Sequence, residues 1–137
     1  MLDDLILAYH DVLILLARVL LMVLFLTTGW RKLTNFSATA TYMASTGSPL
    51  PKLSTVAAIG MECFIAIALV VGVFTGPLAL LYFVFTFVTA LIGHRFWDAT
   101  GAERDAQKIN FLKNVSIMGG LLLLAVTGPG KYALMPR

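Results

Sequence analysis

The sequence predicts an all-α integral membrane protein, a four-helix bundle with a short interfacial helix between helices 1 and 2. Three observations predict this class. Of the 137 residues, 59% are hydrophobic and only 12% are charged, where a soluble domain carries about 25% charged residues. The mean hydropathy is +0.89. The apolar residues form four long runs, and most Lys and Arg residues lie at the ends of these runs, which indicates membrane anchoring rather than nucleic-acid binding.

The four apolar runs cover residues 12–30, 55–74, 77–92 and 111–127. A helix needs about 20 residues to cross about 30 Å of hydrocarbon. Each run is near that length, so we expect four crossings. No stretch is long enough to act as a linker, and residues 1–137 are expected to form a single domain. The chain opens with two aspartates rather than a basic segment, so we expect the first run to be retained as a span.

The first span ends with Trp30, Arg31 and Lys32, an aromatic residue and two long cations that suit a membrane interface. Residues 36–45 are moderately amphipathic, and the sequence Gly-Ser-Pro-Leu-Pro at 47–51 stops any helix there. This pattern predicts a short helix that lies at the interface and covers what is beneath it.

Residues 75–77, Thr-Gly-Pro, join the second and third spans. Gly commonly ends a helix and Pro commonly begins one, so a tight antiparallel hairpin is expected at this point. Residues 94–108 are polar and are predicted to form the main hydrophilic loop. Four crossings place both termini on one side. The loop side carries more Lys and Arg, so the positive-inside rule predicts cytoplasmic loops and termini outside.

Several kinds of chemistry are excluded by residue type. Cys63 is the only cysteine, so the chain has no internal disulfide and no Cys-x-x-Cys pair. His10 and His94 fall at opposite faces, which excludes bis-histidine haem ligation within one chain. Asp98 is the only acid near His94 at ligand spacing, so no metal site is predicted. Phosphate loops, dinucleotide fingerprints and nucleophile elbows are absent. We therefore predict no catalytic residue and no covalently bound cofactor.

Charged residues inside the spans point to a polar cluster. Arg18 lies well inside the first span, where an Arg costs roughly 2.5 to 3.5 kcal/mol on insertion scales, so it needs a partner or a polar cavity. Glu62 in the second span is the expected partner. The helical repeat places one set of residues on a common face of the first helix: Arg18, Met22, Phe25, Gly29 and Lys32.

The fourth span brings further polar residues to the loop side. Asn110, Lys113 and Asn114 share one helix face, and His94 and Trp97 end the third span at the same level. Together these residues predict a pocket that opens toward the loops and narrows inward. The candidate ligand-binding or proton-relay residues are Arg18, Lys32, Glu62, His94, Trp97, Asn110, Lys113 and Asn114.

Each candidate also has a structural interpretation. An ion pair between Arg18 and Glu62 would lock two helices together. Lys113 suits a snorkelling lysine and Trp97 a belt anchor, while the asparagines suit hydrogen bonds between helices. His94 suits a proton carrier, a donor to a carbonyl or an ordinary interfacial histidine. The residues alone leave these alternatives open.

The chain resembles the DoxX family of small four-helix membrane proteins over nearly its whole length. The resemblance lies in the order and spacing of segments 18–32, 61–62, 94–97, 110–120 and 128–130. It implies a bacterial or archaeal inner-membrane protein, related to the membrane subunit DoxD of thiosulfate:quinone oxidoreductase and to proteins associated with oxidoreductases. It implies no single established activity.

Three functions are compatible with these observations. The preferred hypothesis is a quinone-binding or redox-associated membrane subunit. In it, His94, Asn110, Lys113 and Asn114 would bond the carbonyl groups of the quinone, while Glu62 and Arg18 would tune the field of the pocket or relay protons. Electrons would come from a partner, so the chain is at most a membrane subunit of an oxidoreductase. The alternatives are a non-enzymatic scaffold that docks a partner and, less favoured, a small-molecule or lipid transporter. The expected partners are the bilayer and an oxidoreductase or other membrane subunit; homo-oligomerisation stays open.

Overall fold

The computed structural model describes residues 1–136, and every regular element within that range is helical. The elements are α1 (Leu2–Ala8), α2 (His10–Thr34), α3 (Phe36–Ser45), α4 (Pro51–Ile59), the π-helix η1 (Gly60–Ile65), α5 (Ala66–Val71), α6 (Thr75–Gly93), the 3-10 helix η2 (Phe96–Asp98) and α7 (Gly101–Thr127). Four helices are long and apolar enough to cross a membrane: His10–Thr34, Pro51–Val71, Thr75–Asp98 and Gly101–Thr127. The predicted all-α membrane fold is confirmed.

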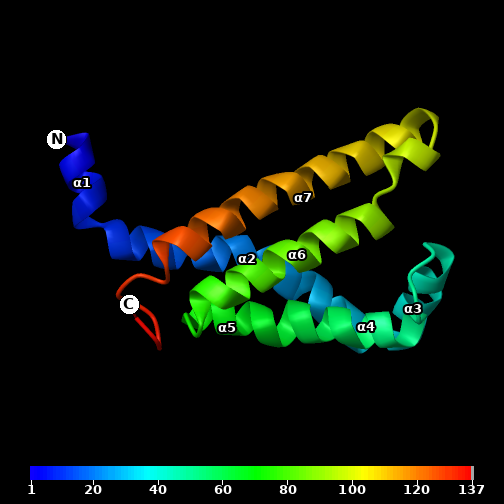
Figure 1. The fold of residues 1–137 in the computed structure, drawn as a ribbon, viewed down its shortest axis with the longest axis horizontal. Helices are drawn as coiled ribbons and strands as arrows, with labels where there is room; N and C mark the ends of the chain where they lie inside the picture. The colour runs from blue at the N-terminus through cyan, green and yellow to red at the C-terminus, as the bar shows by residue number, and fades with distance from the viewer. Residues whose placement is uncertain (137) are drawn as a thin grey trace.

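The long helices pair as two antiparallel hairpins (Figure 1). In the first, α2 packs against the continuous rod of α4, η1 and α5; in the second, α6 packs against α7. Contacts of α2 with α7 and of α5 with α6 join the two hairpins. Both termini and the α5–α6 turn lie at one end of the molecule, here called the terminal end. Helices α3 and η2 lie at the other, the loop end, as the even number of crossings predicts.

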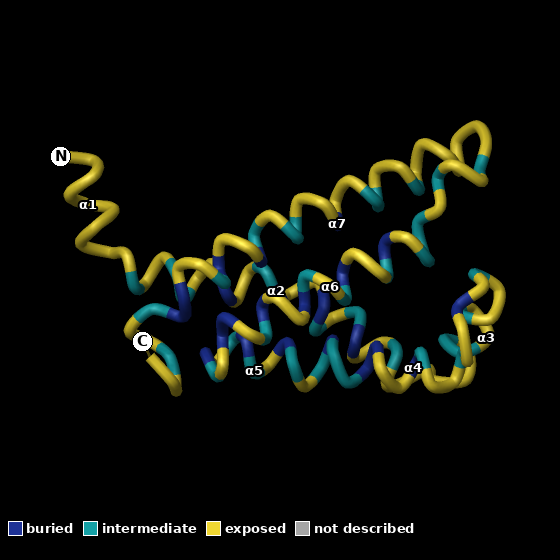
Figure 2. Tube along the Cα trace, in the orientation of Figure 1, coloured by how far each residue is buried: buried dark blue, intermediate teal, exposed yellow. Residues whose placement is uncertain are grey.

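Buried residues line the inner faces of the helices (Figure 2). On α2 they are Arg18, Met22, Phe25 and Gly29, so the predicted shared face is confirmed. The core comprises Met22, Phe25, Ala66, Leu69, Ala79, Tyr82, Leu121 and Leu124. The outer faces are also apolar, with large side chains such as Leu20 and Phe64 exposed. A helix that is apolar all round is typical of a membrane span.

The short helix predicted over residues 36–45 is present as α3, with the same bounds. It packs against α4 and the end of α2 and therefore sits beside the first hairpin rather than over the α6–α7 hairpin. Arg95 Nη2 donates a hydrogen bond to the Thr46 carbonyl oxygen at 3.1 Å. The two loop-end connections are thus tied to each other.

The turn between α5 and α6 lies earlier than predicted. Helix α5 ends at Val71, and Gly72 caps it in the left-handed conformation at φ +78°. Gly76 and Pro77 instead belong to the first turn of α6, where a proline needs no N–H partner. Gly72 is required because a Cβ there would lie 2.4 Å from the Ala133 Cβ.

The predicted hydrophilic loop at 94–108 is largely helical. Helix α7 begins at Gly101 and continues without a break to Thr127. Its first eight residues include Ala, Glu, Arg, Gln and Lys, all of which have high helix propensity. Polarity marks the part of the helix that extends beyond the apolar span, and only residues 94–100 form the connection.

Candidate functional site

An ion pair between a partly exposed lysine and a buried glutamate joins α2 to η1. Lys32 Nζ donates to Glu62 Oε1 at 2.7 Å and also contacts Oε2. Thr28 Oγ1 donates to Glu62 Oε2 at 2.8 Å. Glu62 is only 6% exposed, so both of its oxygens are satisfied inside the protein. Hydrogen bonds to an ionised carboxylate are roughly twice as strong as those between neutral groups.

The local sequence explains this geometry. Thr28 and Lys32 are four residues apart in sequence and therefore share a face of α2. Gly29 lies between them and lets η1 approach, because a Cβ there would be 2.8 Å from the Glu62 Cβ and 2.9 Å from the Cys63 Sγ. Glu62 itself lies in the π-helical turn, a rare feature that often marks functional sites in helices.

The predicted ion pair between Arg18 and Glu62 is wrong. Arg18 is fully buried, but its Nη2 donates to the carbonyl oxygen of Tyr132. The reason is depth: Arg18 lies about 15 Å from Thr28 along α2, at about 1.5 Å per residue. Lys32 is on the same face and closer to Glu62, so Lys32 forms the ion pair with the Glu62 carboxylate.

Arg18 instead holds the C-terminal segment, residues 128–136, against the terminal end. The Lys131 amide donates to Asp11 Oδ1 at 2.9 Å. The Leu134 amide donates to the Val71 carbonyl at 2.9 Å, and the Met135 amide to the Gly72 carbonyl at 3.1 Å. Within the described chain, Arg18 Nε and Nη1 have no hydrogen-bond partner. These contacts give Arg18 a structural role at the C-terminal segment, which differs from the predicted helix-locking pair with Glu62.

The other five predicted residues occur in the α6–α7 hairpin and its connection. His94 Nδ1 lies 2.9 Å from Gln107 Oε1, and Lys113 Nζ donates to Asn110 Oδ1 at 3.2 Å. Trp97 is half exposed and makes edge contacts with neighbouring aromatic rings, as expected of a belt anchor.

The eight predicted residues thus divide into three places rather than one pocket. Lys32 and Glu62 meet between α2 and η1, and Arg18 lies at the terminal end. His94, Trp97, Asn110 and Lys113 belong to the α6–α7 hairpin and its connection, and Asn114 lies one turn beyond Asn110 in α7. A groove between α3 and α4 and a smaller hollow beside η2 are lined by different residues.

The sequence analysis missed three buried polar residues of α6, namely Thr75 at its first turn and the pair Tyr82 and Thr86 further along. Tyr82 and Thr86 are fully buried, and neither hydroxyl has a hydrogen-bond partner among the described residues. The Tyr82 ring contacts the Phe25 ring with centroids 4.7 Å apart. The sequence did contain a signal for the pair. Tyr82 and Thr86 are four residues apart in a largely apolar helix, so their hydroxyls lie on one face of it.

Register places the Thr86 hydroxyl at about the same level of the bundle as the ion pair. Helices α2 and α6 run in the same direction (Figure 1), so one turn beyond the Phe25–Tyr82 contact, Thr86 comes level with Gly29.

Helix α7 contributes one more residue at this level. The His94–Gln107 contact sets the register of the α6–α7 hairpin, which brings Asn114 to the level of Thr86. Asn114 is 8% exposed. We call this set the polar layer: Thr28, Lys32, Glu62, Tyr82, Thr86 and Asn114.

Comparison with known proteins agrees with this architecture. The family model described as DoxX matches residues 13–95. The chain is 47% identical over 130 residues to the inner membrane protein YphA of Escherichia coli K12, covering 95% of this chain and 93% of that protein. It is 38% identical over 125 residues to the inner membrane protein YqjF of the same organism, covering 91% of each. No solved structure matches significantly. The chain belongs to the DoxX family.

Proposed function

We propose that this chain is a multi-pass inner-membrane subunit whose polar layer binds the head group of an isoprenoid quinone. The membrane location is supported by the four apolar helices and by the names of the two relatives. The observation that carries the ligand proposal is the pair of buried hydroxyls, Tyr82 Oη and Thr86 Oγ1, which have no partner among the described residues.

Burying a hydroxyl without a hydrogen-bond partner lowers the stability of the folded protein. Leaving a buried donor or acceptor unsatisfied costs about 1 to 3 kcal/mol, and most such groups in folded proteins have a partner. Two O–H donors on one face of α6 suit a ligand that accepts hydrogen bonds and is itself largely apolar. A quinone has carbonyl oxygens to accept them and an isoprenoid tail that suits the apolar helices.

The neighbouring ion pair would supply the proton chemistry. Reduction of a quinone to a quinol takes two electrons and two protons, one proton to each carbonyl oxygen. The electrons would come from a partner oxidoreductase. The pair of Lys32 and Glu62 is 2.7 Å apart and lies on the loop-end side of Tyr82, so it would exchange protons between the loop end and the bound head group.

A membrane scaffold is the second candidate, and one observation favours it. His94 is bonded to Gln107, and Lys113 to Asn110, so polar groups of the α6–α7 hairpin are satisfied within the chain. In that case the polar layer would hold buried water, and the loop end would dock a partner.

The experiment that separates the two is quinone retention. The protein is purified from membranes in mild detergent, and the extracted quinone is quantified by liquid chromatography. We expect near-equimolar quinone in the natural protein. Tyr82→Phe and Thr86→Val each remove one hydroxyl with little change in volume, and we expect each to lower retention about fivefold to tenfold, as loss of one hydrogen bond does.

Tyr42→Phe is the matched control, because Tyr42 is exposed on α3, and it should retain quinone like the natural protein. Absence of quinone from the natural protein, or equal loss in the control, would exclude the quinone proposal and favour the scaffold.

A further inference from the structure

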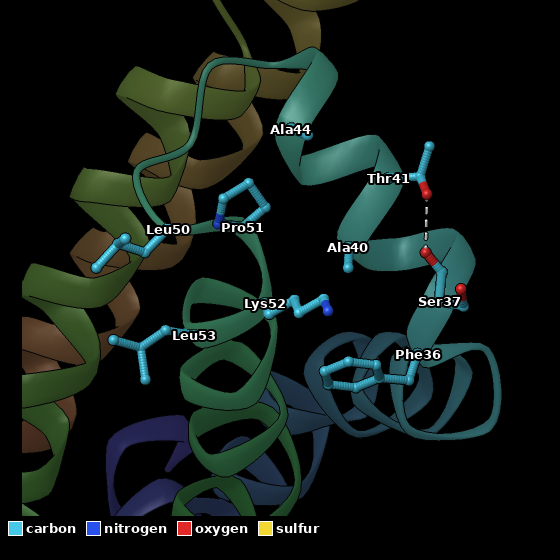
Figure 3. A pocket seen from close by; sticks show the side chains of 9 residues that line it. All are labelled: Phe36, Ser37, Ala40, Thr41, Ala44, Leu50, Pro51, Lys52 and Leu53. Atoms are coloured by element: carbon cyan, nitrogen blue, oxygen red, sulfur yellow. Dashed lines mark hydrogen bonds between the residues drawn. The ribbon is translucent and has the colours of Figure 1, made fainter.

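A groove of about 890 Å³ lies between α3 and the start of α4 at the loop end (Figure 3). Its apolar lining includes Phe36, Ala40, Ala44, Leu50 and Leu53. It is separate from the polar layer, since none of its lining residues belongs to that layer. A groove of this size exceeds what a single buried water needs and is within the range of small-molecule sites.

One cation points into this groove. Among the described residues that line it, Lys52 alone is charged. Its side chain extends from α4 toward α3, between Phe36 and Ala40 (Figure 3). Within residues 1–136, no carboxylate forms an ion pair with Lys52. Lys52 is exposed, so its ammonium group is accessible to an anionic group at the membrane surface.

The position of the groove in the membrane favours the phosphate of a phospholipid as this anion. Helix α3 lies beside the start of α4 at the loop end (Figure 1), which is the level of the lipid head groups in a bilayer. A free phosphate would match Lys52 but leave the apolar lining uncovered. A phospholipid matches both, because its glycerol backbone links the phosphate to two acyl chains.

We propose that the α3–α4 groove binds one anionic phospholipid, with its phosphate on Lys52 and an acyl chain along Phe36, Ala40 and Leu53. This site would hold α3 in place at the membrane surface. It does not depend on the quinone proposal, since the two sites share no residue.

The test is native mass spectrometry of the purified full-length protein, titrated with phosphatidylglycerol or phosphatidylethanolamine of the same acyl chains. We expect one phosphatidylglycerol to bind about fivefold more tightly than phosphatidylethanolamine, the preference that one lysine near a membrane surface supplies. Lys52→Gln should abolish that preference. Lys108→Gln removes an exposed cation of α7 and should leave it unchanged.

A second variant tests the apolar part of the groove. Ala40→Trp fills the groove beside Lys52 and should weaken binding of both lipids while the lysine remains. The proposal is overturned if Lys52→Gln retains the lipid preference, if Lys108→Gln loses it equally, or if inorganic phosphate alone displaces the lipid. Thermal unfolding of each variant checks that the bundle is intact.

Discussion

Gly29 of α2 and Glu62 of η1 approach so closely that a Cβ on Gly29 would lie 2.8 Å from the Glu62 Cβ. Gly29→Ala must therefore push η1 away from α2 and strain the contacts of Glu62 with Thr28 and Lys32. We expect a loss of about 1 to 3 kcal/mol in the free energy of unfolding, measured by denaturant titration in detergent. Gly119→Ala is the control, because no atom lies within 4 Å of its added Cβ. An equally stable Gly29→Ala protein would contradict the close packing.

Because Lys32 and Glu62 form an ion pair, we expect the losses in the free energy of unfolding caused by substituting each residue not to add. Lys32→Met leaves the buried Glu62 carboxylate without its counter-ion, and we expect a loss of about 3 to 5 kcal/mol. Adding Glu62→Leu removes the stranded charge and should restore most of the stability. Unfolding of the two single variants and the double variant measures the coupling. Additive losses would show that the two side chains act independently.

Arg18 is expected to hold the C-terminal segment in place. Arg18→Met removes the hydrogen bond to the Tyr132 carbonyl and should loosen the adjoining amides of Leu134 and Met135. Hydrogen exchange followed by mass spectrometry should show these amides exchanging roughly tenfold faster, the effect of losing about 1.4 kcal/mol of local stability. Arg31→Met, at an exposed position of α2, should leave their exchange unchanged. Unaltered exchange in Arg18→Met would contradict the role of Arg18.

Orientation in the membrane is predicted by the excess of cations at the loop end. Alkaline phosphatase fused after residue 136 should be active, because the termini are expected outside. Green fluorescent protein at the same position should remain dark. The same reporters inserted after Ala99, in the η2–α7 connection, should give the opposite pattern. The reverse result would place the loops outside.

The sequence predicted those features that depend on local periodicity. Apolar length predicted four spans, the helical repeat predicted the buried face of α2 that includes Met22 and Phe25, and the Gly and Pro residues after Thr46 predicted the end of α3. These features are set by residues within a few turns of one another, so a single chain segment contains enough information.

The sequence failed where distant segments decide between two similar residues. Arg18 and Lys32 share a face of α2, and only the depth of η1 beside that helix selects Lys32 as the partner of Glu62. Gly72 and Gly76 both suit a helix end, and the position of Ala133 beside Gly72 decides between them. The sequence also did not show which helix faces meet, and it therefore predicted one pocket where the structure separates these residues.

The most direct test of the polar layer is infrared difference spectroscopy with quinone that carries ¹³C-labelled carbonyl groups. Hydrogen bonds from Tyr82 and Thr86 should lower the carbonyl stretching frequency of the bound quinone relative to quinone in detergent. The combined variant Tyr82→Phe with Thr86→Val should abolish that shift. A carbonyl band in the natural protein that coincides with the band in detergent would contradict head-group binding at the polar layer.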